Sequence, residues 1–417
     1  MSKIIVQGGK QLSGVIEVNG AKNSALPILA ATLIAEGEYK LDNVPDLKDI
    51  RTMIKLLQTF GLEIEKIGEH SYKIINTGVS DIEAPYELVK EMRASFVVMG
   101  PLLSNLKKAK VSLPGGCAIG TRPIDFHLAG FAKLGCKIVL DQGFVSAEAT
   151  ELVGNKIKLP FPSVGATENI LMAGVKAKGE TRISNAAREP EIDDLCNFLN
   201  KMGAQISGIG TDELIITGVE KLTPCQYNII PDRIEAGTFI IASIITGGSL
   251  EIAGVVENHL GGFIKKLEKM GVEFEFVGDK IKVKANLEKL KSIKISTEPY
   301  PGFPTDLQAQ TMVLLSLANG NSEIKETIFE NRFMHVLELD RMGANIKLDG
   351  NKAKITGPVK FNGAEVSATD LRAGAALVLA GIVAKGETII NEIHHIERGY
   401  ENLVERLLLV GVDIKKV

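Results

Sequence analysis

The sequence predicts an α/β fold of two lobes, each built from three copies of one repeated unit. Two signatures predict this architecture. The first is an apolar helix end followed by Gly and a β-like run, which recurs at Gly61, Gly135, Gly203, Gly271, Gly343 and Gly411 with spacings of 68 to 74 residues. The second is a turn with a strand pattern, 23 to 25 residues upstream of five of these glycines. Regular recurrence of this kind indicates six units in a chain of 417 residues.

Each unit is predicted to begin with a buried helix, a turn and a strand. The helix patterns ALPILAATLIA, GTFIIASIIT and RAGAALVLAGIVA are apolar on most faces, as in helices with no solvent-exposed side. The turn and strand then read AEGEYKL, AKGETRI, TGGSLEI, ANGNSEI and AKGETII in five units. The second unit has LKKAKVSL at this place.

The second half of each unit is predicted to be a helix and two strands. The helix begins about 13 residues before the Gly of the first signature, which fits a helix C-cap that leads into a strand. The last strand reads SYKIINTG, ELIITGVEKL, DKIKVKA or KAKITGPVKF. The sixth unit stops at Val417 without this strand, and residues 3–12 (KIIVQGGKQL) have its pattern. We therefore expect the N-terminus to close the sixth unit.

This assignment divides the chain into two predicted lobes. Lobe I covers residues 22–230 and lobe II covers residues 1–21 and 231–417. The two chain crossings between them are expected to act as a hinge.

Composition argues against several classes of protein. Lys and Arg number 48 against 51 Asp and Glu, and aromatic residues make up 5%, which disfavours a nucleic-acid-binding protein. The longest apolar run, residues 373–384, is too short to cross a bilayer, and the N-terminus has no signal-peptide pattern. The four cysteines have no metal-ligand spacing. We expect a cytoplasmic protein with reduced thiols, no metal or other cofactor, no membrane contact and no obligate protein partner.

Polar residues gather at the predicted helix starts. The first helices of the units begin at Lys22-Asn23, Arg93, 164–166, Asp232-Arg233, Asp306 and Asp370 to Arg372, and the second helices begin at Lys48, Arg122, Glu189, Asn258, Glu330 and Arg398. Helix N-termini with Arg and Lys side chains attract phosphate and carboxylate groups. Eight basic residues (Lys22, Lys48, Arg93, Arg122, Arg233, Arg332, Arg372 and Arg398) are thus expected to line the space between the lobes and to bind a small polyanion.

A structural role for these charges is the alternative. They could cap helices, or pair with Asp49, Asp125, Glu189, Asp232, Asp306, Glu330 and Asp370. For Asp306, which begins a buried helix after the Pro-rich segment TEPYPGFPTD, capping is the plainer interpretation.

The segment PGGCAIGTRP, residues 114–123, is the most unusual in the chain. It differs from a nucleoside-triphosphate loop because Arg122 stands where Ser or Thr is required and no Lys follows the last Gly. A Gly-rich stretch with a thiol beside an Arg instead suggests a mobile lid whose Cys117 transfers a proton or attacks a substrate. Cys136, Cys196 and Cys225 lie in apolar contexts or plain loops and are expected to be structural.

With these residues in view, the sequence resembles the UDP-N-acetylglucosamine 1-carboxyvinyltransferase family of enolpyruvyl transferases. The resemblance runs from Ile4 to the last residues, in the order NGAKNSALPILAA, LKDIRTM, MRAS, PGGCAIGTRPIDFH, PSVGATEN, AAREPEI, PDRIEAGTF, GFPTDLQAQ, IFENRF, TDLRAGAAL and IERGYE. It implies two inside-out α/β lobes of three βαβαββ units each. It also implies transfer of the enolpyruvyl group of phosphoenolpyruvate to the 3-hydroxyl of UDP-N-acetylglucosamine through a tetrahedral ketal.

The resemblance implies a role for each matching residue. Phosphoenolpyruvate would be held at its phosphate by Lys22, Arg122 and Arg398 and at its carboxylate by Arg332 and Arg372, with Asn23 close by. Asp306 would take the proton of the sugar hydroxyl, and Cys117 would act as general acid. The nucleotide sugar would contact Asn23, Arg93, Arg122, Pro123, Asp125, Phe126, His127, Ser163, Val164, Gly165, Asp306 and Ile328, and Lys48, Asp49, Glu189, Asp232, Arg233, Glu330 and Asp370 would support the site.

One departure and three alternatives stay open from the sequence. Some family members have Lys where this chain has Phe161, followed by Pro162, which leaves a diphosphate contact in doubt. A 5-enolpyruvylshikimate-3-phosphate synthase has the same lobes but lacks the thiol loop. A non-catalytic metabolite-binding relative would have no need of Lys22, Cys117, Asp306 and Arg398 together. A nucleic-acid-processing enzyme built from related repeats is disfavoured by the net charge.

Overall fold

The computed structural model describes residues 2–113, 119–120 and 123–417. Cys117 and Arg122 therefore lie outside the described residues. The chain divides into two compact units. Unit 1 covers residues 2–19, 119–120 and 231–417, and unit 2 covers residues 20–113 and 123–230. Within the described part of the chain, no helix is long and apolar enough to cross a membrane.

Unit 2 contains three repeats. The first comprises α1 (Lys22–Ala31), β3 (Gly37–Asp42), α2 (Lys48–Thr59), β4 (Glu63–Gly68) and β5 (Ser71–Asn76). The second comprises β6 (Glu83–Ala84), α3 (Tyr86–Glu91), the 3-10 helix η1 (Arg93–Val98), α4 (Met99–Leu106), β7 (Lys108–Ser112), α5 (Asp125–Lys133), β8 (Lys137–Asp141) and β9 (Phe144–Glu148). The third comprises β10 (Lys156–Lys158), α6 (Val164–Gly174), β11 (Glu180–Ser184), α7 (Pro190–Lys201), β12 (Gln205–Ser207), β13 (Glu213–Thr217) and β14 (Gln226–Asn228).

Unit 1 begins with two N-terminal strands and continues with three repeats after residue 230. The strands are β1 (Ile4–Gln7) and β2 (Ser13–Glu17). The fourth repeat comprises α8 (Arg233–Thr246), β15 (Ser249–Ala253), η2 (Glu257–Leu260), α9 (Gly261–Met270), β16 (Glu273–Val277) and β17 (Lys280–Lys284). The fifth comprises η3 (Leu287–Lys289), β18 (Lys294–Ser296), η4 (Thr305–Leu307), α10 (Gln308–Leu317), β19 (Gly320–Lys325), α11 (Val336–Arg341), β20 (Ile346–Asp349) and β21 (Lys352–Gly357). The sixth comprises β22 (Glu365–Ser367), α12 (Leu371–Val383), β23 (Glu387–Asn391), η5 (Ile393–Arg398), α13 (Leu403–Leu409) and β24 (Asp413–Lys416).

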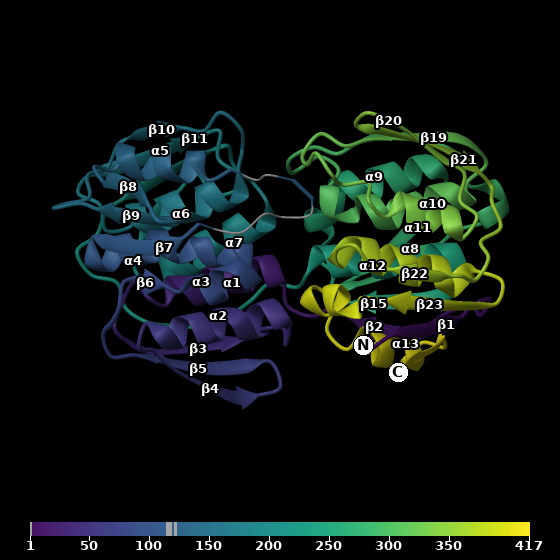
Figure 1. The fold of residues 1–417 in the computed structure, drawn as a ribbon, viewed down its shortest axis with the longest axis horizontal. Coiled ribbons are helices and arrows are strands. Elements are labelled where there is room, and N and C mark those ends of the chain that lie inside the picture. The colour runs from purple at the N-terminus through teal and green to yellow at the C-terminus, as the bar shows by residue number, and fades with distance from the viewer. Residues whose placement is uncertain (1, 114–118, 121–122) are drawn as a thin grey trace. The chain divides into compact units, whose positions relative to one another are not determined.

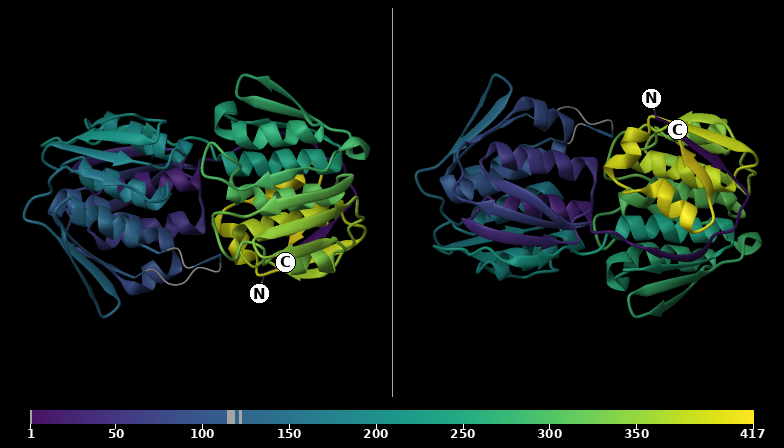
Figure 2. Two further views of the ribbon diagram at one scale, coloured as in Figure 1. Left: turned by 90° about the horizontal axis from the view of Figure 1, so that it is seen from above. Right: turned by 90° about the horizontal axis from the view of Figure 1, so that it is seen from below.

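The described residues form six four-stranded sheets that share one topology. Their orders are β14-β3-β5-β4, β6-β7-β9-β8, β10-β11-β13-β12, β2-β15-β17-β16, β18-β19-β21-β20 and β22-β23-β1-β24. In each sheet the first strand pairs in parallel with the second, and the other pairings are antiparallel. Within each unit the sheets lie outside the first helices of the repeats, such as α8, α10 and α12 in unit 1 (Figures 1 and 2). This arrangement contains the six α/β units that the repeat predicts and has the inside-out architecture that the family resemblance implies.

The interior helices have no polar face because the sheets of their own unit cover them. In unit 1, α8, α10 and α12 pack against one another, and all residues of α8 after Arg233 are buried. Each unit has its own apolar core. The consequence for function is that α8, α10 and α12 can present polar side chains at the surface of the unit only at their ends.

The glycines of the first signature end helices as predicted. All six adopt positive φ, between 94° and 104°, a region that favours Gly. The N-terminal strand also pairs as the pattern predicts, because β1 lies between β23 and β24 in the sixth sheet.

Two second helices are shorter than predicted. In the fifth repeat α11 begins at Val336 instead of near Glu330, and in the sixth α13 begins at Leu403 instead of at Arg398. Arg398 ends η5, and the chain then passes through Asn402 at φ 46°, a conformation that interrupts a right-handed helix. The start positions predicted for α11 and α13 were therefore wrong. Glu330 and Arg398 lie in the segments that precede these two helices.

Candidate active site

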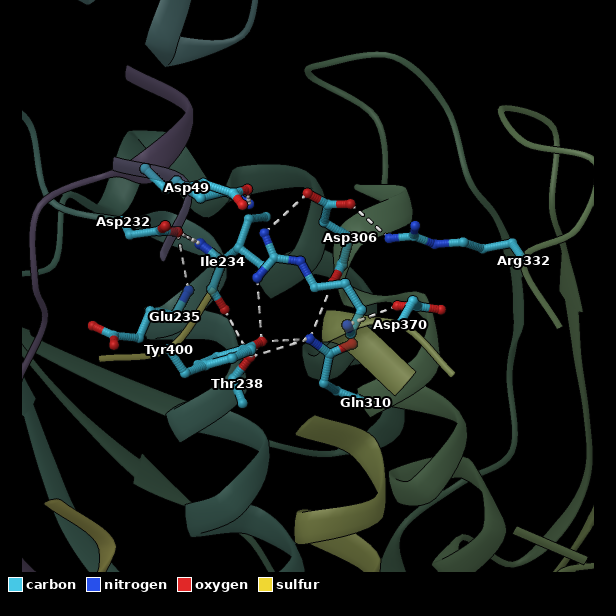
Figure 3. Close-up of polar contacts among 12 residues, drawn as sticks. Asp49, Asp232, Ile234, Glu235, Thr238, Asp306, Gln310, Arg332, Asp370 and Tyr400 are labelled. Carbon is cyan, nitrogen blue, oxygen red and sulfur yellow. Dashed lines mark hydrogen bonds and ion pairs between the residues drawn. The ribbon is translucent and has the colours of Figure 1, made fainter. Parts of the chain in front are cut away.

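Asp306 is the centre of the charged cluster in unit 1. It lies in η4, a short helix that begins after Pro304 and leads into α10. One carboxylate oxygen accepts a hydrogen bond from Arg332 at 2.7 Å, and the other accepts one from Arg372 at 3.1 Å (Figure 3). Both arginine side chains are 3% exposed, against 26% for Asp306. The capping interpretation of Asp306 is not the observed one, because its carboxylate bridges two buried guanidinium groups.

Arg372 keeps its charge in spite of its burial. Desolvation lowers the pKa of a buried cation, but the nearby Asp306 carboxylate and the Tyr400 hydroxyl outweigh it and raise the pKa of Arg372 above its ordinary value. Removal of the anion that pairs with such a buried cation would strongly destabilise the folded protein. The Asp306 cluster can therefore present two fixed positive groups to a carboxylate or phosphate.

Two other predicted site residues are helix caps. The Asp232 carboxylate accepts hydrogen bonds from the backbone of Ile234 at 2.8 Å and of Glu235 at 3.1 Å, at the start of α8 (Figure 3). Asp370 accepts in the same way from Arg372 at 2.8 Å and Ala373 at 3.0 Å, at the start of α12. The structural alternative thus holds for these two carboxylates. By capping α12, Asp370 also fixes the helical turn that carries Arg372.

The remaining predicted residues of unit 1 surround these helix starts. The Arg233 guanidinium lies 5.7 Å from the centre of the Tyr300 ring. The backbone N–H of Ile328 donates to Glu326 at 2.8 Å. Glu330 reaches Gly120, where a Cβ would stand 2.0 Å from its carboxylate oxygen, so this glycine cannot carry a side chain with Glu330 in place.

In unit 2, Lys22 and Asp49 form a buried ion pair. Lys22 is the first residue of α1, and Asp49 lies in the first turn of α2, next to Lys48. Their charged groups are 3.4 Å apart, and the side chains are 10% and 6% exposed. Asn23 follows Lys22 in the same helical turn. The start of α1 therefore presents an ammonium group that a neighbouring carboxylate orients.

His127 is held as a neutral ring in unit 2. Burial, followed by the positive charge of Arg93, lowers the pKa of His127 to about 3. The Asn169 side-chain oxygen accepts from the backbone of Gly100 at 2.7 Å, so its NH₂ group is the donor toward His127 Nδ1 at 2.9 Å. Nδ1 therefore accepts and Nε2 carries the proton. Asn169 was missed from the sequence because its partners lie 42 and 69 residues away.

The start of α6 adjoins this ring. The Ser163 hydroxyl caps the helix by accepting from Ala166 at 3.4 Å, and Val164 and Gly165 form its first turn. A Cβ on Gly165 would lie 3.2 Å from the His127 ring, so glycine leaves room for the histidine. Pro123, Asp125 and Phe126 lead into and begin α5, which carries His127.

Three glutamates meet where α6 and α7 begin. Glu189 is the N-cap residue of α7, and Glu191 lies in its first turn. Burial, and then the charges of Glu191 and Glu189, raise the pKa of Glu168 well above its ordinary value. Burial and the two neighbouring carboxylates therefore favour the protonated form of Glu168. Within the described part of the chain, no group of three or more His, Cys, Asp or Glu side chains could hold a metal ion.

The three described cysteines are free thiols in protected places. Cys136 and Cys196 are buried, and Cys225 is partly buried. Burial raises the pKa of all three, to about 11 for Cys136. Burial of this kind disfavours the reactive thiolate form, as expected of structural cysteines.

Comparison with known proteins identifies the family. A family profile described as EPSP synthase (3-phosphoshikimate 1-carboxyvinyltransferase) matches residues 6–407. UDP-N-acetylglucosamine 1-carboxyvinyltransferase 1 of Caldanaerobacter subterraneus subsp. tengcongensis is 53% identical over 99% of this chain and 99% of its own length. The chain belongs to the UDP-N-acetylglucosamine 1-carboxyvinyltransferase family. Another member, UDP-N-acetylglucosamine 1-carboxyvinyltransferase 1 of Staphylococcus aureus, is 50% identical over the full length of both chains.

Solved structures agree with this family fold. The enolpyruvyl transferase NikO from Streptomyces tendae matches 100% of this chain and 99% of its own with a TM-score of 0.91 at 25% identity. EPSP synthase from Acinetobacter baumannii also matches 100% of this chain and 99% of its own, with a TM-score of 0.76 at 19% identity. At this identity the match supports the fold alone. The charged helix starts described above are therefore set on an enolpyruvyl transferase scaffold.

Proposed function

We propose that this protein transfers the enolpyruvyl group of phosphoenolpyruvate to the 3-hydroxyl of UDP-N-acetylglucosamine and releases phosphate. The observation that carries the proposal is sequence identity of about half, over the full length of both chains, to relatives named for this reaction. Such an enzyme supplies the first committed intermediate of peptidoglycan synthesis, and we assign it to the cytoplasm.

The proposed chemistry is an addition followed by an elimination. Asp306 takes the proton of the sugar 3-hydroxyl while that oxygen bonds to C2 of phosphoenolpyruvate, and Cys117 gives a proton to C3. The resulting tetrahedral ketal then loses a proton from C3 and expels phosphate, which restores the vinyl group. No electron acceptor is needed, because no atom changes its oxidation state over the two steps together.

The proposed binding roles follow the charges. Arg332 and Arg372 take the carboxylate of phosphoenolpyruvate, and Lys22, Arg122 and Arg398 take its phosphate. Arg332 and Arg372 already hold a carboxylate, that of Asp306, which supports their assignment as carboxylate ligands. The proposed ligands of the nucleotide sugar are Asn23, Arg93, Arg122, Pro123, Asp125, Phe126, His127, Ser163, Val164, Gly165, Asp306 and Ile328, with Lys48, Asp49, Glu189, Asp232, Arg233, Glu330 and Asp370 in support.

The test is a phosphate-release assay with two acceptor substrates. Phosphoenolpyruvate with UDP-N-acetylglucosamine should release phosphate in step with acceptor consumed. Phosphoenolpyruvate with shikimate 3-phosphate is the control, because the matching family profile is described by that reaction. Phosphate release with shikimate 3-phosphate alone would show that the protein is a 5-enolpyruvylshikimate-3-phosphate synthase instead. Phosphate release with neither acceptor would favour a non-catalytic metabolite-binding protein.

A second experiment tests the role of Cys117. The epoxide fosfomycin should add to Cys117 and abolish activity, which mass spectrometry of peptides detects. Cys136, Cys196 and Cys225 are internal controls, because burial raises the pKa of each thiol. Labelling of one of these three, or full activity after Cys117 is modified, would remove this cysteine from the mechanism.

A further inference from the structure

The Tyr400 hydroxyl is the meeting point of a buried polar cluster in unit 1. Tyr400 is 2% exposed and follows η5. Its oxygen lies 2.9 Å from the Thr238 hydroxyl, 3.0 Å from the Gln310 amide nitrogen and 3.4 Å from Arg372 Nη1. Figure 3 shows Tyr400, Thr238 and Gln310 converging. The partners come from α8, α10 and α12, so one hydroxyl joins the starts of the three interior helices.

The direction of each hydrogen bond in this cluster follows from its neighbours. The Thr238 hydroxyl donates to the Ile234 carbonyl at 2.8 Å, so its oxygen is left to accept. Tyr400 therefore donates to Thr238, and the phenol oxygen accepts from Gln310 and from Arg372. Gln310 also donates to the backbone carbonyl of Asp306 at 3.0 Å, which ties the same cluster to η4.

The guanidinium of Arg372 thus has a different partner at each end. Nη2 donates to the Asp306 carboxylate at 3.1 Å, and Nη1 donates to Tyr400. The guanidinium carbon also lies 5.6 Å from the centre of the Tyr400 ring. Two separate acceptors fix the plane of a rigid guanidinium, whereas one acceptor would let it rotate.

Gly399 allows Tyr400 to approach α12 closely. A Cβ at this position would lie 2.4 Å from the Leu371 side chain and 3.6 Å from Arg372 Nη1. The segment that follows Arg398 is therefore packed directly against the first turn of α12.

We propose that Tyr400 is a positioning residue that holds the Arg372 guanidinium in the orientation that receives the carboxylate of phosphoenolpyruvate. This inference rests on the proposed function, in which Arg372 binds that carboxylate. Tyr400 touches neither substrate and acts through Arg372. The hydroxyl, rather than the ring, makes the directional bond, so its removal should affect one substrate selectively.

The test compares Tyr400→Phe with a matched control, Tyr39→Phe. Tyr39 is fully buried in unit 2, and its hydroxyl donates to the Ala35 carbonyl at 2.8 Å. Tyr400→Phe should raise KM for phosphoenolpyruvate about 10-fold, the effect of losing a hydrogen bond to a charged group. KM for UDP-N-acetylglucosamine should stay within about twofold, the scale of half a kcal/mol. Tyr39→Phe should change neither constant.

A double-mutant cycle separates positioning from a general loss of structure. In an Arg372→Lys background, Tyr400→Phe should no longer raise KM for phosphoenolpyruvate, because its partner is gone. Thr238→Val removes the acceptor of the Tyr400 proton, and should give a smaller selective rise. This variant carries the test if Tyr400→Phe does not fold.

Three results would overturn the proposal. The first is an unchanged KM for phosphoenolpyruvate in Tyr400→Phe, and the second is an equal rise of KM for both substrates. The third is a rise of KM for phosphoenolpyruvate that is as large in the Arg372→Lys background as in the wild type. Each of these leaves the proposed function intact, since the wild-type enzyme is active in all three. Absence of phosphate release by the wild type would instead overturn the proposed function and this inference with it.

Discussion

Asp306 and the two arginines on either side of its carboxylate show how a residue acquires its role from partners far along the chain. The sequence indicates a carboxylate and several cations at helix starts. Lys22 and Arg372 lie there in the structure, and Asp306 lies in η4 directly before α10. Arg332 and Arg398 instead lie in the segments before α11 and α13. It does not indicate that Arg332 and Arg372 share Asp306, because they lie 26 and 66 residues away. Partner choice depends on how the fifth and sixth repeats fold and pack, and local patterns do not contain that information. For the same reason Tyr400 and Asn169 were not candidates.

Asp306→Asn should reduce phosphate release strongly. The amide cannot take a proton from the sugar hydroxyl, and loss of general base catalysis lowers rates by about 10²- to 10⁴-fold. The buried Arg332 and Arg372 would also lose their anion, so the melting temperature should fall. The control is Asp349→Asn, which removes an exposed pair with Lys354 at 3.2 Å and should leave kcat unchanged. A kcat for Asp306→Asn within threefold of the wild type would contradict the assigned role.

His335 should make the stability of the protein depend on pH. It is 1% exposed, with its ring 3.2 Å from the Met312 sulfur. Burial is the main cause that lowers the pKa of His335 below its ordinary value. The unfolded chain therefore binds a proton that the folded chain does not, at pH values below about 6.5 and above the lowered pKa.

The expected result is that the free energy of unfolding decreases as pH falls below about 6.5. Urea unfolding at pH 5 and pH 7 measures the difference, which should be smaller in His335→Gln, where this group no longer titrates. Equal differences in both proteins would show that His335 does not contribute.

At the scale of elements, the repeat was predictable because glycine is favoured at the positive φ with which the second helix of each unit ends before a strand. The six glycines at positive φ marked the units correctly. The residue pattern alone gave three strands per unit, and the fourth, a parallel edge strand, was implied only by the family resemblance. These edge strands are short, as in β6 (Glu83–Ala84) and β10 (Lys156–Lys158), so they show no period in the sequence. The late starts of α11 and α13 were missed because backbone turns before them have no strong residue preference.

The one repeat without a glycine at its first turn offers a stabilising substitution. Lys107 adopts φ 59° and is exposed, where the equivalent turns have glycine at positive φ, as at Gly386. Lys107→Gly should raise the free energy of unfolding by up to about 1 kcal/mol, because a left-handed backbone is unfavourable for a residue with a Cβ.

The matched control is the reverse change, Gly386→Ala. No atom lies within 4 Å of a Cβ at Gly386, so its backbone at φ 91° is the only source of strain. This variant should be less stable by about 1 kcal/mol or more. Thermal unfolding of both variants measures the effects, and a stabilised Gly386→Ala would refute the argument.

At the scale of the molecule, the N-terminal segment belongs to two sheets of unit 1. β1 lies in the middle of the sixth sheet, and β2 pairs in parallel with β15 at the edge of the fourth. The two ends of the chain are neighbours, since Lys3 and Val417 exchange backbone hydrogen bonds at 2.7 and 2.9 Å. The pattern of residues 3–12 predicted the first pairing. The second was not foreseen, because a five-residue strand with one buried residue carries no signal of its own.

This arrangement predicts that the chain tolerates circular permutation. A short linker from Val417 to the N-terminus, with new ends in the exposed turn at Gly278-Asp279 between β16 and β17, should leave the urea unfolding midpoint close to that of the wild type. Deletion of residues 2–8 is the contrasting variant. This deletion removes the buried side chains of Ile4 and Val6 from the middle of a sheet. Burial of each side chain stabilises the fold by about 1.5 to 3 kcal/mol, so unit 1 should unfold at a much lower urea concentration. Equal midpoints would contradict the central place of β1.

The same connectivity orders events during synthesis on the ribosome. Residues 20–230 emerge as one continuous stretch and contain every strand of their three sheets, so that half can fold while translation continues. The N-terminal strand β1 cannot pair at that stage, because its partners β23 and β24 are among the last residues to be translated. The first strand to be made is therefore the last to find its neighbours, and until then a nascent chain carries it unpaired.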